Sequence, residues 1–128
     1  MSDSSSIIQL TRKLIRIPST SDKPDQLQEV IHLMTSHIKQ YPNITVEQFE
    51  SKGKPSLLAY RGGKRPTSFH ILLNGHLDVV PAHSRQFIPQ IRGGRLYGRG
   101  ALDMKTAASA LTHVFCELAD QCVQPLGL

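Results

Sequence analysis

The sequence of 128 residues has no tryptophan, and its aromatic residues amount to only 5%. So few aromatic side chains argue against a surface on which nucleic-acid bases stack. The 15 Lys and Arg residues exceed the 10 Asp and Glu residues only slightly, and the resulting charge of +5 is spread along the chain. Such an excess favours anionic small ligands at most, so we expect no nucleic-acid partner.

Cysteine and long apolar runs are scarce as well. Cys116 and Cys122 form neither a Cys-x-x-Cys motif nor a disulfide framework, so we expect the free thiols of a reducing compartment. No apolar run approaches the roughly 18 residues that a membrane span needs. The N-terminus, Met-Ser-Asp-Ser-Ser-Ser, lacks the basic and apolar regions of a secretory signal. We therefore expect a cytoplasmic protein without a membrane partner.

What is present suffices for one folded domain, since 39% of the residues are apolar. Apolar residues recur at helical spacing over residues 7–17, 24–38 and 105–119, which predicts three amphipathic helices. Pro18 ends the first helix, and Pro24 suits the first turn of the second.

Between the second and third helices the pattern changes to that of strands. Residues 44–49 alternate between apolar and polar, and residues 57–60 form a second short strand. Residues 69–73 are almost continuously apolar, which predicts a central strand covered on both faces. We expect a loop over residues 74–100 and the start of another strand at residues 124–128. This order of elements indicates an α/β fold.

The first candidate site follows the apolar run, in the sequence Asn-Gly-His-Leu-Asp-Val-Val-Pro of residues 74–81. His76 and Asp78 are two residues apart, so in extended backbone their side chains point to the same side. A histidine oriented by a carboxylate is typical of zinc sites. A hydrogen-bonded loop histidine beside a turn aspartate explains the same spacing, and this interpretation stays open on the spacing alone.

The second candidate site is a glycine-rich stretch, residues 93–105, that leads into the third helix. A phosphate-binding loop does not fit it. The dinucleotide fingerprint requires glycine where Asp103 stands, and the P-loop requires glycine where Met104 precedes Lys105. A carboxylate at the start of a helix would repel phosphate, whereas its two oxygens suit one or two cations.

Together these motifs resemble the zinc metallopeptidase and deacylase family that includes acetylornithine deacetylase, succinyl-diaminopimelate desuccinylase, aminoacylase and carboxypeptidase G. The similarity covers nearly the whole chain. It rests on Leu14–Ser19, on Gly75–Pro81 and on Gly98–Lys105. The last two motifs are specific because they occur in this order and at about this separation.

The resemblance implies a fold and an activity. Residues 1–128 would be the N-terminal part of a mixed-sheet, zinc-hydrolase-like catalytic domain with helices on both faces, without the family's lid and dimerisation domain. His76 would ligate one zinc and Asp103 would bridge two zincs, for which cobalt is the second option. Asp78 would belong to the catalytic machinery as the carboxylate that orients His76. The peptide bond between Asp103 and Met104 would be cis.

The implied reaction is hydrolysis of an amide bond in an N-acyl amino acid or small peptide, by a water that the two metals activate. The complete protein would be a homodimer. The family's Asp-Glu-Glu stretch, with its general base, and its later ligands would come after Leu128. Glu117 and Asp120 stand at the end of the third helix, where we expect them to be solvated. We therefore expect this chain alone to be inactive.

The other histidines and the basic residues also admit ordinary explanations. His83 is expected to be an ordinary loop residue, His32 and His37 surface or boundary residues of the second helix, and His113 a packing residue of the third. The alternative function is a non-enzymatic basic module that binds anions or nucleic acid. It predicts a salt-dependent affinity for phosphate polymers and no bound metal.

Overall fold

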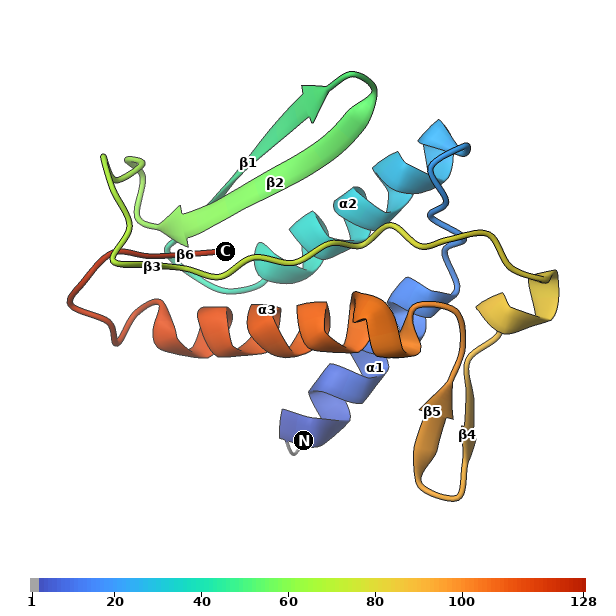
Figure 1. Cartoon of the computed structure of the whole chain (residues 1–128). Coiled ribbons are helices and arrows are strands. Elements are labelled where there is room, and N and C mark those ends of the chain that lie inside the picture. The colour runs from blue at the N-terminus through green and yellow to red at the C-terminus, as the bar shows by residue number, and fades with distance from the viewer. Residues whose placement is uncertain (1–2) are drawn as a thin grey trace.

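The computed structural model describes residues 3–128, in which three helices lie against a small sheet (Figure 1). The helices are α1 (Asp3–Ile15), α2 (Pro24–Ile38) and α3 (Thr106–Leu118). All three agree closely with the helices predicted from the apolar periodicity. Within residues 3–128, no helix is both long enough and apolar enough to cross a membrane.

The main sheet is mixed and has four strands. The strands β1 (Ile44–Ser51) and β2 (Lys54–Arg61) form an antiparallel hairpin. The short strand β6 (Leu126–Gly127) pairs antiparallel with β2 and parallel with β3 (Ile71–Leu72), which gives the order β1-β2-β6-β3. The α/β fold with a mixed sheet is therefore confirmed.

The helices and the β1–β2 hairpin pack together in one apolar core. Strand β1 meets α2 where Gln48 Nε2 donates to Thr35 Oγ1 at 2.8 Å, and α2 meets α3 where Thr112 Oγ1 lies 3.4 Å from the Met34 sulfur. The three helices and the inward side chains of the hairpin form a single core.

The apolar run at residues 69–73 also differs from expectation. Strand β3 lies at the edge of the sheet, and Ile71 and Leu72 are 53% and 54% exposed. Its only strand neighbour within residues 3–128 is β6. A run of apolar residues predicts a strand in apolar surroundings. It does not predict whether that strand pairs with one or with two other strands of the sheet.

The stretch expected to be a loop contains a second, two-stranded sheet. Strands β4 (Gln90–Arg92) and β5 (Arg95–Tyr97) form an antiparallel hairpin that projects from the body of the molecule (Figure 1). Gly93 and Gly94 connect them with φ values of 56° and 72°. Two consecutive residues with positive φ are what a tight hairpin turn requires, so the Gly-Gly pair was the signal for it.

The fold predicts that substituting two apolar side chains near the C-terminus changes the free energy of unfolding by very different amounts. Phe115 of α3 is fully buried in the core, whereas Val123 is 97% exposed. Phe115→Ala should lower the free energy of unfolding by about 3–5 kcal/mol because it leaves a cavity. Val123→Ala should change it by less than roughly 0.5 kcal/mol. Urea denaturation measures both, and similar small losses would contradict this core.

Candidate functional site

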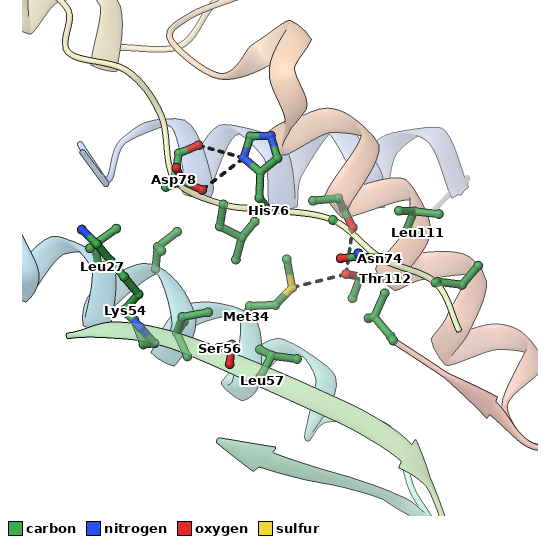
Figure 2. A pocket seen from close by; sticks show the side chains of 18 of the residues that line it. Leu27, Met34, Lys54, Ser56, Leu57, Asn74, His76, Asp78, Leu111 and Thr112 are labelled. Carbon is green, nitrogen blue, oxygen red and sulfur yellow. Dashed lines mark hydrogen bonds and ion pairs between the residues drawn. The ribbon is translucent and has the colours of Figure 1, made fainter. Parts of the chain in front are cut away.

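The first half of the site is the extended segment that follows β3. His76 Nδ1 lies 3.1 Å from the Asp78 carbonyl oxygen and 3.2 Å from Asp78 Oδ1. Both side chains lie on the side of the segment that faces away from Met34 and Leu57 (Figure 2). The predicted same-side arrangement of His76 and Asp78 is therefore confirmed, and it follows from the alternation of side chains in extended backbone.

These contacts determine which nitrogen of His76 is available. A carbonyl oxygen can only accept a hydrogen bond, so the hydrogen belongs on Nδ1. In the neutral ring, Nε2 is then left with its lone pair. That nitrogen is the one that points away from Asp78 and toward the second half of the site.

The second half of the site is Asp103, in the short irregular helix η2 (Ala101–Lys105). Asp103 itself has extended backbone, with φ −127° and ψ 102°, and the Asp103–Met104 peptide bond is cis, as the resemblance implies. Asp103 Oδ1 lies 3.1 Å from His76 Nε2, although the residues are 27 positions apart in sequence. The structure therefore brings together the three residues that the two motifs supply.

The electrostatics of the site favour a cation. Partial burial disfavours the charged ring of His76, but the Asp78 carbonyl, the contact with Asp103 and both carboxylate charges outweigh this effect, so the pKa of His76 is raised. A lone pair and a carboxylate that face each other need a positive charge between them. A proton on the ring or a metal ion can supply it.

The spacing suits a metal as well as a proton. Two ligands of one tetrahedral zinc, each about 2.0–2.1 Å from the ion, lie roughly 3.3 Å apart, close to the 3.1 Å between His76 Nε2 and Asp103 Oδ1. The side chains of His76 and Asp103 are 47% and 82% exposed, so the site is open to solvent. Within residues 3–128, no group of three or more His, Cys, Asp or Glu side chains is placed to hold a metal.

A largely apolar cavity of about 530 Å³ runs along the same segment (Figure 2). It is bounded by α2, β2, the segment 73–78 and α3, and its lining includes Leu27, Met34 and Leu111. Gly75 lies against η2 and α3, where a Cβ would come within 3.3 Å of Met104 Cε and 3.8 Å of Ala108 Cβ. His76 and Asp78 also line this cavity, and their side chains lie on the side of the segment that faces away from Met34 and Leu57.

Sequence analysis missed the importance of Lys105. Its side chain is fully buried, and Nζ donates to the carbonyls of Leu14 and Ile17 at 2.8 Å each. Burial lowers the pKa of Lys105 to about 8, against the opposing effect of the Asp78 charge. The available signal was a lysine two residues after the candidate ligand Asp103, but lysines are mostly exposed.

The remaining candidates lie elsewhere, as expected. His83 Nδ1 accepts from the Arg85 backbone N–H at 3.3 Å, which is a local loop contact. Asp120 lies 3.6 Å from Arg61 on the surface. Cys116 and Cys122 are free thiols, and burial raises the pKa of Cys116 to about 12. A buried thiol that resists ionisation is a poor metal ligand.

Comparisons with known proteins agree with this geometry. Residues 72–127 match the family described as Peptidase family M20/M25/M40. Succinyl-diaminopimelate desuccinylase from Sphingopyxis alaskensis is 38% identical over 112 residues, which cover 80% of this chain and 28% of that protein. The same enzyme from Aromatoleum aromaticum is 46% identical over 70 residues, which cover 50% of this chain and 17% of that protein. The chain thus spans less than a third of these relatives.

Two solved structures share the fold. Human carnosine dipeptidase 1 superposes with a TM-score of 0.63 at 24% identity, covering 96% of this chain and 31% of that one. The di-peptidase Dug1p from Saccharomyces cerevisiae superposes with a TM-score of 0.68 at 19% identity, covering 97% and 31%. Sequence and fold agree: residues 72–127 match peptidase family M20/M25/M40, and nearly the whole chain shares the fold of the two dipeptidases.

Proposed function

We propose that His76 and Asp103 are ligands of a metal centre in a hydrolase that cleaves an amide bond. The observation that carries this proposal is the 3.1 Å approach of His76 Nε2 to Asp103 Oδ1, while Asp78 holds the opposite ring nitrogen. Zinc is the proposed metal, with cobalt as a substitute, because imidazole nitrogen and carboxylate oxygen are common zinc ligands.

The residues of the proposed site have separate roles. Asp78 keeps the hydrogen on Nδ1 of His76 and fixes the plane of the ring, so that Nε2 stays aimed at the ligand position. Asp103 presents a carboxylate that is mostly exposed, which leaves room for a substrate beside it. When bound, the metal would supply an activated water and stabilise the charge that develops on the substrate oxygen.

The proposed substrate is an N-acyl amino acid or a dipeptide. Its support is chemical agreement among the similar proteins, which are by name a desuccinylase of an acylated amino acid and two dipeptidases. Each name implies hydrolysis of an amide bond in a small molecule. Which acyl group or amino acid this protein would take depends on contacts beyond His76, Asp78 and Asp103.

The metal site predicts an ordered series of affinities. Cobalt or zinc titration, followed by visible absorption or calorimetry, should detect binding to the 128-residue chain. His76→Ala should weaken it by more than roughly 100-fold because it removes a ligand, and Asp78→Asn by about 10–100-fold because it removes an orienting partner. His83→Ala is the matched control and should have no effect. Equal affinity in the chain and in His76→Ala would refute the site.

The chain alone is expected to show no turnover. Within residues 3–128, no group of three or more His, Cys, Asp or Glu side chains is placed to hold a metal, and we expect the general base to be missing as well. Loss of a general base costs about a hundred- to ten-thousand-fold in rate. The test is an assay with zinc or cobalt on N-acyl amino acids and dipeptides. Turnover that disappears in Asp103→Ala would mean that a complete site exists within these residues.

A further inference from the structure

One short connection contacts both halves of the candidate site. It is the segment Ile17–Thr20, part of the connection between α1 and α2, in which Ile17, Ser19 and Thr20 are buried. On the first half, Ser19 Oγ donates to the Leu77 carbonyl at 2.7 Å, and the Val79 N–H donates to the Ser19 carbonyl at 3.0 Å. These bonds hold the backbone on either side of Asp78, so the segment that carries His76 is fixed to this connection.

The second half is held by Lys105, two residues after Asp103. Its ammonium donates to the Leu14 and Ile17 carbonyls, which lie at and just beyond the C-terminal end of α1. A buried charge is costly unless it is paired by hydrogen bonds, and the C-terminal end of a helix favours a positive charge. Moving the Lys105 ammonium out of this position would break these interactions. Lys105 therefore fixes the loop that carries Asp103.

The two halves also meet directly beside this connection. Gly100 lies between them with φ +85°, and a Cβ on it would come within 2.8 Å of Val79 Cγ1 and 3.0 Å of Lys105 Cδ. No other residue fits there without displacing one of the two. Val79, Gly100 and Lys105 thus form a close-packed contact on the side of the site away from the ligand pair.

We infer that Lys105 and Ser19 are positioning residues, which set the separation of His76 and Asp103 by tying each half of the site to the same connection. This inference rests on the proposed metal centre for its functional meaning. Neither Lys105 nor Ser19 forms a hydrogen bond with His76 or Asp103. Both act on the ligand pair through the backbone of the segments that carry the two ligands. Loosening either tie should make the two ligands move independently.

The experiment compares Lys105→Met, Ser19→Ala and the control Thr11→Val in the 128-residue chain. Thr11 is a fair control because it is fully buried and its hydroxyl donates at 2.8 Å to the carbonyl of Ile7, which belongs to neither half of the site. Cobalt affinity and the visible spectrum of the cobalt complex are measured together with thermal stability. Both site variants should bind cobalt about 10-fold or more weakly, with an altered spectrum, whereas Thr11→Val should lose stability only.

Amide hydrogen exchange supplies a readout that needs no metal. Lys105→Met should accelerate exchange at Val79, whose N–H is bonded to Ser19 on the other half of the site. Ser19→Ala should accelerate exchange at Lys105, whose N–H is bonded to Gly100. If Lys105→Met does not fold, the cobalt binding and amide exchange of Ser19→Ala alone test the positioning role.

The outcomes separate this inference from the proposed function. A chain that binds no cobalt refutes the metal centre, and the exchange data then still decide whether the two halves are tied together. Unchanged cobalt affinity and spectrum in a folded site variant overturn the positioning role, even where the chain binds metal. Exchange that changes no more than in Thr11→Val overturns it as well.

Discussion

A buried ammonium group joins the start of this chain to its second motif. Lys105 directly precedes α3 and donates two hydrogen bonds to carbonyls at and just beyond the end of α1, 91 and 88 residues earlier in the sequence. The desolvation of a lysine is acceptable only where carbonyl oxygens replace water, and the carbonyls at a helix C-terminus are oxygens without partners inside the helix. The position of α1 therefore fixes the loop that contains Asp103.

The other half of the site depends on the alternation of an extended segment. Leu77 packs against the apolar core and Val79 is buried, while His76 and Asp78 point to the opposite side and stay accessible. A shift of one residue would bury the polar pair, so the core itself fixes the register. The packing of Leu77 and Val79 thereby keeps the side chains of His76 and Asp78 at the surface.

The sequence predicts well what depends on local periodicity. The three helices and the β1–β2 hairpin follow from the spacing of apolar residues, and the same-side placement of His76 and Asp78 follows from their separation of two. The meeting of His76 with Asp103 could not be derived from spacing, because the contact is made across the fold. It was expected only because the two motifs together resemble a family.

The errors have equally specific causes. The β4–β5 hairpin was missed because its strands are three residues each, although Gly93-Gly94 marked the turn. Strand β3 lies at the edge of the sheet, which its composition does not reveal. Lys105 was overlooked because a charged residue predicts exposure unless carbonyl partners are known, and its partners belong to a helix far away in sequence.

The central claim is that one imidazole and one carboxylate of this chain hold a metal. X-ray absorption at the zinc edge of the zinc-loaded chain tests it most directly, because it distinguishes nitrogen and oxygen ligands from sulfur. The account predicts a first shell of nitrogen and oxygen only, with a single imidazole that disappears in His76→Ala. Sulfur ligands from Cys116 or Cys122, or an imidazole that persists in His76→Ala, would contradict it.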